Sequence, residues 1–221
     1  MYKACIFDLD GTLANTLDSI AYFGNAALNF YGYNSIDANE YKNFIGNGAD
    51  VLIERMLRFN GINFTKEEQT KIRNKYDRLY EENPLYLVNP YDGITCLLEN
   101  LNENKVKVAV LSNKPHDMTT VVAKTLFHDV SFFEVLGQSE KFEKKPSPEA
   151  VNYLVSKMNY NKNEVLYIGD SGVDMQTATN AKLNSVGVLW GFRGKQELEE
   201  NGATFTVNSA LELANIILNR R

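Results

Sequence analysis

Two acidic residues directly after an apolar run are the first candidates for chemistry in this chain. The segment CIFDLDGT (5–12) places Asp8 and Asp10 at the end of an expected strand, where residues i and i+2 point to the same side. Two carboxylates in one cavity repel each other unless a cation lies beside them. A hard, oxygen-seeking ion such as Mg²⁺ would remove that conflict. A solvated polar turn explains the pair equally well, so other residues must decide.

Two later segments offer groups that suit a phosphate. Ser112 ends the apolar segment VKVAVLSN (106–113), and its hydroxyl and the following backbone N–H, that of Asn113, are suited to a phosphate oxygen. Lys145 stands before Pro146, which holds the lysine backbone extended while the prolines of KKPSPEA start a helix. We therefore expect the Lys145 ammonium to reach back over the sheet. A polar strand end and an exposed charge run are the plain structural alternatives.

A second acidic pair lies in YIGDSGVDM (167–175). Asp170 ends a strand, and the glycines beside it permit a tight turn, so that Asp174 is expected to open the next helix. A carboxylate that ends a buried strand is costly unless it is paired, which favours a metal ligand at Asp170. Asp174 would bind the same metal, directly or through water, or serve as an ordinary helix N-cap. Asp8, Asp10, Asp170 and Asp174 are thus the predicted metal ligands.

The elements that must position these residues read as an α/β fold. Near-continuous apolar segments alternate with helical patterns, which predicts a Rossmann-like parallel sheet covered by helices on both faces. In such sheets, sites form at the carboxyl ends of the strands, where these polar residues fall. The expected strands are 3–10, 106–113, 132–137, 164–170, 185–190 and a short edge strand at 204–208, and the helices between them are 116–127, 146–159 and 174–183.

One region breaks this alternation. Residues 16–83 contain three helical patterns and no strand candidate, with Asn47 expected to cap the second helix. An all-helical block after the first strand predicts a small cap domain over 16–83, inserted into a catalytic core of 1–15 and 84–221. Substrate choice would then depend on the cap.

Composition excludes several classes of function. A formal charge of −5 and a pI of about 5.2 disfavour binding to nucleic acid or to an anionic membrane. The two cysteines do not make a disulfide framework, and no apolar run approaches a membrane span. We expect a cytoplasmic protein that acts on a small molecule as a monomer or homodimer.

Together, DLDGT, LSN, KKPSP and GDSGVD resemble the four motifs of the haloacid dehalogenase (HAD)-like hydrolase superfamily, from Met1 to about Phe205. The resemblance implies that Asp8 is the nucleophile and Asp10 the general acid/base. It also implies that Ser112 and Lys145 hold phosphate and that the late aspartates bind Mg²⁺. The dehalogenase branch lacks the second aspartate, so Asp10 favours a Mg²⁺-dependent phosphatase that acts through an aspartyl-phosphate.

The substrate is predicted from the helical segment. FIGNGADVLIERML (44–57) resembles the cap segment of bacterial phosphoglycolate phosphatases, and Gly46, Asn47 and Gly48 would leave backbone N–H groups for a small carboxylate. An ordinary glycine-containing turn is the alternative. A β-phosphoglucomutase-type mutase and a broad-specificity phosphatase for sugar phosphates, nucleotides or pyrophosphate remain open. A catalytically silent regulator that binds phosphate ligands is the non-enzyme alternative.

Overall fold

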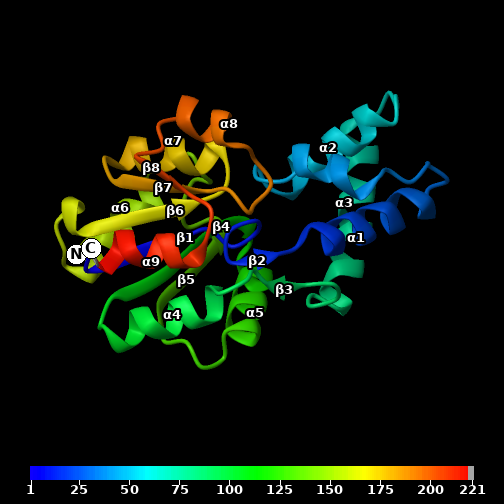
Figure 1. Ribbon diagram of the computed structural model, residues 1–221. Coiled ribbons are helices and arrows are strands. Elements are labelled where there is room, and N and C mark those ends of the chain that lie inside the picture. The colour runs from blue at the N-terminus through cyan, green and yellow to red at the C-terminus, as the bar shows by residue number, and fades with distance from the viewer. Residues whose placement is uncertain (219–221) are drawn as a thin grey trace. The chain divides into compact units, whose positions relative to one another are not determined.

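The computed structural model describes residues 1–218, and a six-stranded parallel sheet is its main element (Figure 1). The strand order is β5–β4–β1–β6–β7–β8, which confirms the predicted α/β class and places the short strand at an edge. The strands are β1 (Ala4–Phe7), β4 (Lys107–Pro115), β5 (Phe132–Gln138), β6 (Val165–Gly169), β7 (Asn184–Val188) and β8 (Phe205–Val207).

The central strands are buried on both faces, as their continuous apolar sequences require. All four residues of β1 are inaccessible to solvent, and β1 pairs in parallel with β4 on one side and β6 on the other. Ala4 and Ile6 pack with α6 (Glu149–Met158) and α7 (Gly172–Ala181). On the other face, α4 (Ile94–Glu103) and α9 (Ala210–Leu218) lie together (Figure 1).

Two predicted helix starts were wrong. The helix expected from 146 begins at Glu149, after Pro148, and α7 begins at Gly172 rather than at Asp174. Ser171 is the N-cap of α7, and Asp174 is the third residue of the helix in a reciprocal capping box. The remaining helices of this part are α5 (His116–Leu126), the short 3₁₀ helix η2 (Lys162–Glu164) and α8 (Lys195–Glu200).

Contacts divide the chain into two compact units: Met1–Asn15 with the chain from Pro90 onward, and Thr16–Asn89. The second unit contains α1 (Leu17–Phe30), the 3₁₀ helix η1 (Ala38–Asn43), α2 (Ala49–Phe59) and α3 (Lys66–Glu82). Two short strands, β2 (Ala14–Asn15) and β3 (Asn89–Pro90), pair where the chain passes from one unit to the other.

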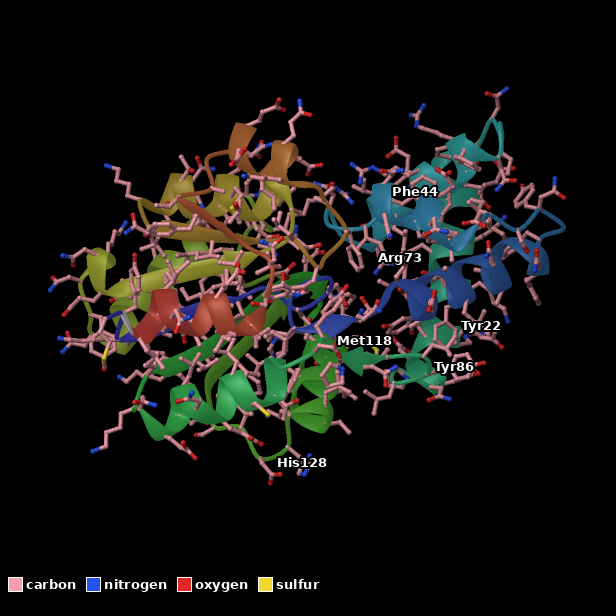
Figure 2. All side chains as sticks on the ribbon, viewed as in Figure 1. Tyr22, Phe44, Arg73, Tyr86, Met118 and His128 are labelled. Atoms are coloured by element: carbon pink, nitrogen blue, oxygen red, sulfur yellow. The ribbon has the colours of Figure 1, made fainter. Side chains whose placement is uncertain are left out.

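Aromatic packing holds the helical unit together. The fully buried Tyr41 lies against Gly24, where a Cβ would approach its hydroxyl to 2.6 Å, and this hydroxyl donates to Asn25 Oδ1 at 3.0 Å. Tyr22 and Tyr86 lie side by side with ring centroids 4.7 Å apart (Figure 2). Throughout residues 1–218, helices that combine the length and apolarity of a membrane span are absent.

Candidate active site

Three buried carboxylates meet at the carboxyl ends of β1 and β6. Asp8 follows the last residue of β1, Asp170 follows β6, and Asp174 lies in the first turn of α7. One oxygen of each lies within 4.8 Å of the others, and their exposed fractions are 6, 2 and 0%. Burial, together with the carboxylate of Asp174, raises the pKa of Asp8 to about 7. The same two causes raise the pKa of Asp170 well above its usual value.

Lys145 provides the positive charge beside two of these carboxylates. Its ammonium lies 2.8 Å from Asp8 Oδ1 and 2.8 Å from Asp174 Oδ1, and it donates to Leu111 O at 3.3 Å. Burial alone lowers the pKa of Lys145, but Asp174 and Asp8 outweigh it and hold the pKa well above 10.5. The lysine is therefore charged throughout the ordinary pH range.

Asn113 fixes the backbone of Lys145. Its Oδ1 accepts the Lys145 N–H at 2.9 Å, and its Nδ2 donates to the Lys145 carbonyl at 3.2 Å. The predicted phosphate contact is with the backbone N–H of Asn113, and the structure adds a second role for this residue, because its side-chain amide is bound to the loop that carries the lysine. This pair joins the end of β4 to a residue 32 positions away.

Asp174 has hydrogen bonds on both of its oxygens. Oδ1 accepts from Lys145 and, at 3.2 Å, from the Tyr167 hydroxyl, which is fully buried. Oδ2 accepts from the backbone N–H and the hydroxyl of Ser171. Four donors on one carboxylate fix its position beside Lys145. Tyr167 and Ser171 were not among the predicted site residues, although both lie in the YIGDSGVDM segment.

Asp10 has a different partner from the three clustered carboxylates. Because β1 ends at Phe7, the strand geometry that would point Asp8 and Asp10 the same way does not continue to residue 10. The Asp10 carboxylate instead lies 3.2 Å from Lys114 Nζ, and Lys114 is itself 9% exposed. Sequence reasoning missed Lys114; its place directly after LSN was the available signal.

Ser112 lies next to these groups at the end of β4. Its oxygen accepts the backbone N–H of Lys114 at 3.2 Å, and the residue is 4% exposed. Because this bond uses a lone pair of the hydroxyl oxygen, the hydroxyl proton remains available for donation to a phosphate oxygen.

The donor set fits a divalent cation. Four carboxylates (Asp8, Asp10, Asp170 and Asp174) and two ammonium groups (Lys114 and Lys145) carry a formal charge of −2, which is −4 plus +2. Asp8 Oδ1 is buried and, although close to Lys145, has no hydrogen-bond donor in a suitable direction among the described residues. Clustered carboxylate oxygens are the ligands that Mg²⁺ prefers. Asp10 is not a member of the three-carboxylate group.

The predicted substrate-binding residues of the helical unit form a loop before α2. Gly46 and Gly48 have φ values of +113° and +89°, and Gly48, not Asn47, is the N-cap of α2. Asn47 is instead bound by Arg55, whose Nη2 donates to Asn47 Oδ1 at 2.9 Å and whose Nη1 donates to Phe44 O at 3.0 Å. Arg55 thus orders the loop, and Asp50, in the first turn of α2, pairs with Arg73.

Comparisons with known proteins identify the family of this chain. Residues 5–188 match the sequence profile of the haloacid dehalogenase-like hydrolases. The chain is 30% identical to the phosphoglycolate phosphatase of Vibrio parahaemolyticus, over 97% of this chain and 96% of that one. It is likewise 30% identical to the phosphoglycolate phosphatase of Mannheimia succiniciproducens, over 98% of each chain.

A crystal structure of a protein from Lactobacillus delbrueckii subsp. bulgaricus superposes with a TM-score of 0.93 at 31% identity, covering 99% of both chains. The chain therefore belongs to the haloacid dehalogenase-like hydrolase family, and within it is an enzyme of the phosphatase type.

Proposed function

We propose that this protein is a Mg²⁺-dependent phosphomonoester hydrolase that acts through an aspartyl-phosphate on Asp8, with 2-phosphoglycolate as its substrate. The observation that carries the proposal is the group Asp8, Asp170 and Asp174 with Lys145 at 2.8 Å from two of them. Asp8, Asp170 and Asp174 would hold Mg²⁺, which when bound offsets negative charge on the phosphoryl oxygens.

In the first half-reaction, an Asp8 carboxylate oxygen forms a bond to phosphorus while the bond from phosphorus to the ester oxygen breaks. Asp10 gives its proton to the departing alkoxide. Lys145 and the Ser112 hydroxyl bind the phosphoryl oxygens as charge builds on them. The Lys114 ammonium beside Asp10 sets where that carboxyl lies.

In the second half-reaction, Asp10 accepts a proton from a water molecule whose oxygen attacks phosphorus. The bond between Asp8 and phosphorus breaks, which releases inorganic phosphate and restores both carboxyl groups to their starting forms. One residue thus serves as acid and then as base, and no other proton carrier is required.

The substrate proposal rests on the helical unit, for which we propose the role of a cap over 16–83. Two relatives that match nearly the whole chain are phosphoglycolate phosphatases. The loop at 46–48 leads directly into the N-terminus of α2, where backbone N–H groups suit a small carboxylate. A two-carbon phosphate ester with a carboxylate at its far end has the charge that such a loop would select.

Replacing the nucleophile tests the mechanism. Asp8→Asn should lower kcat by about 10⁴-fold or more, because the covalent route is lost. Wild-type protein quenched in acid during turnover should carry phosphate on Asp8 by mass spectrometry. Asp18→Asn, an exposed first-turn aspartate of α1, is the matched control and should leave kcat unchanged. Substantial turnover by Asp8→Asn would overturn the mechanism.

A phosphomonoester panel tests the substrate. With Mg²⁺ present, kcat/KM should be highest for 2-phosphoglycolate, and EDTA should abolish release of phosphate. A higher kcat/KM for sugar phosphates, nucleotides or pyrophosphate would reject the substrate but keep the enzyme class. Isomerisation of a sugar phosphate would indicate a mutase, and no hydrolysis of any ester would indicate a binding protein.

A further inference from the structure

The loop after β7, residues 189–194 (LWGFRG), contacts two parts of the site, although the proposed mechanism uses none of its residues. It is tied to the sheet at its start, where the Leu189 N–H donates to Val207 O at 2.9 Å. It ends at Gly194, the N-cap of α8. Between these points it has no regular secondary structure, so specific contacts must fix its course.

Two hydrogen bonds provide such contacts. The indole Nε1–H of Trp190 donates to the carbonyl of Thr12 at 3.0 Å. Thr12 is fully buried and lies two positions after Asp10. The backbone N–H of Phe192 donates to Asp170 Oδ2 at 2.7 Å. One short loop therefore binds both the turn after β1 and the carboxylate after β6.

Close packing leaves these three segments little freedom. A Cβ on Gly11 would overlap the Asp170 carboxylate and lie 2.9 Å from the Phe192 ring. A Cβ on Gly191 would overlap both Asp170 and the Gly11 carbonyl. Asp170 is thus enclosed between two glycines, and its carboxylate position depends on where the loop lies.

Asp170 needs such a restraint more than its neighbours do. Asp8 and Asp174 each lie 2.8 Å from the Lys145 ammonium, whereas Asp170 accepts a hydrogen bond from the Phe192 N–H and is stabilised by the charge of Arg193, two residues of the 189–194 loop. Asp170 is also repelled by both of those carboxylates in a buried site. Without the loop, repulsion would favour a rotation of its carboxylate away from Asp8.

We propose that Trp190 is a positioning residue for the metal site: its indole N–H fixes the 189–194 loop on the Thr12 carbonyl, and the loop in turn holds Asp170 beside Asp8. The inference rests on the proposed function, since it assumes that Mg²⁺ binds these carboxylates. It assigns a part in metal binding to a residue that does not itself contact the ion.

Removal of a single N–H group tests this role. Trp190 is the only tryptophan in the chain, so global replacement of tryptophan by 3-benzothienylalanine alters this position alone. That analogue keeps the shape of the indole and replaces N–H by sulfur. Mg²⁺ alone, without substrate, is titrated against the full-length protein by calorimetry, and the melting temperature is measured in EDTA. Trp190→Phe provides a second, genetically encoded variant.

We expect the Mg²⁺ dissociation constant to rise about 3- to 10-fold in both proteins, the effect of one lost hydrogen bond. The melting temperature in EDTA should fall by only about 2–4 °C in the benzothienyl protein, because the hydrogen bond is lost but the ring keeps its shape. Lys195→Ala, at an exposed residue just after the loop, is the matched control and should bind Mg²⁺ like the wild type. Gly191→Ala should weaken Mg²⁺ binding further, because its Cβ displaces Asp170 or the Gly11 carbonyl.

Two outcomes would overturn the inference, and only one of them would also reject the metal dependence of the proposed function. If wild type binds Mg²⁺ and both Trp190 variants bind it equally well, Trp190 has only a structural role and the proposed function stands. If wild-type protein does not bind Mg²⁺, the inference fails together with the metal dependence of the proposed function. If the Trp190 variants melt at a lower temperature in EDTA but bind Mg²⁺ as the wild type does, Trp190 likewise has only a structural role.

Discussion

The acidic site at the end of the sheet and the glycine loop before α2 are held in contrasting ways. In the site, buried groups hold one another: Lys145 contacts Asp8 and Asp174, and Asn113 fixes the Lys145 backbone. In the loop, a single side chain, that of Arg55, donates to Asn47 and to two backbone carbonyls. In the first arrangement several buried charged groups depend on one another, whereas in the second one side chain makes contacts with three residues of the loop.

This difference indicates which substitutions the acidic site and the loop before α2 tolerate. Buried charges have no water to replace a lost partner, so each removal in the site leaves an uncompensated charge. The loop is partly exposed and has no such cluster of charges, so losing Arg55 releases backbone groups that water can reach. We therefore expect large effects on folding and chemistry from the site, and smaller effects on substrate binding from the loop.

The largest expected effect comes from removing the buried cation. Lys145→Met leaves Asp8 and Asp174 facing each other and should destabilise the fold by about 3–5 kcal/mol. Lys157→Met is the matched control, because Lys157 pairs with Glu134 at 2.8 Å but is half exposed, and it should destabilise the fold far less than Lys145→Met does. Urea denaturation in EDTA measures both. Equal costs would show that burial does not distinguish the two pairs.

A smaller effect should follow from the second buried lysine. Lys114→Met removes the ammonium that holds the Asp10 carboxylate and should lower kcat about 10- to 100-fold, within the range of general acid–base catalysis. Lys114→Arg keeps the charge and should recover part of the loss. Steady-state rates across pH 5–9 check this, because misplacing the acid/base residue alters the pH profile as well as kcat. An unchanged profile and rate would exclude this role of Lys114.

The sequence predicted which residues lie in the site better than it predicted which of them contact one another. The α/β class followed from apolar strands, and strand ends brought Asp8, Asp170 and Asp174 to one edge because parallel strands all end there. Residues whose roles depend on distant contacts were missed: the Lys114–Asp10 pair spans 104 positions, and the bond from Trp190 to Thr12 spans 178. Local patterns carry no information on such contacts.

Errors of detail had local causes. The strand expected at 3–10 ends at Phe7, because the turn that contains Gly11 begins sooner, and Asp10 as a metal ligand stays a prediction. Asn47 is a residue type that favours the N-cap position. Its side chain instead accepts a hydrogen bond from Arg55, eight positions later, and Gly48 is the N-cap of α2. For Asn47, a tertiary partner overrode a correct local preference.

In the loop, replacement of Arg55 should alter substrate binding more than chemistry. Arg55→Met frees the Asn47 side chain and the Phe44 carbonyl, so KM for 2-phosphoglycolate should rise about 10-fold while kcat changes less. Arg58→Met, on the same helix and in an exposed pair with Glu54, is the matched control and should leave KM unchanged. A large fall in kcat at constant KM would instead place Arg55 with the reacting groups.

The smallest effect is a pH dependence that only the acidic site should show. The pKa of Asp8 is raised from 3.8 to about 7 in the folded protein, so between these values the folded state binds more protons than the unfolded state. Stability of metal-free protein should therefore fall as pH rises through this window and level off above about pH 7. Asp170, whose pKa is also raised, adds to the same trend.

Melting temperatures in EDTA test whether the stability of the metal-free protein falls as pH rises. Between pH 5 and pH 8 the wild type should lose about 3 °C or more relative to Asp8→Asn, which lacks the titrating carboxyl. Added Mg²⁺ should remove most of the difference by raising the melting temperature at pH 8, because the cation binds the carboxylates in their charged form. A wild-type melting temperature that rises with pH relative to Asp8→Asn would mean that Lys145 outweighs burial at Asp8. The acidic site would then gain stability as its carboxylates ionise, and a fall in stability with rising pH would not distinguish it from the loop before α2.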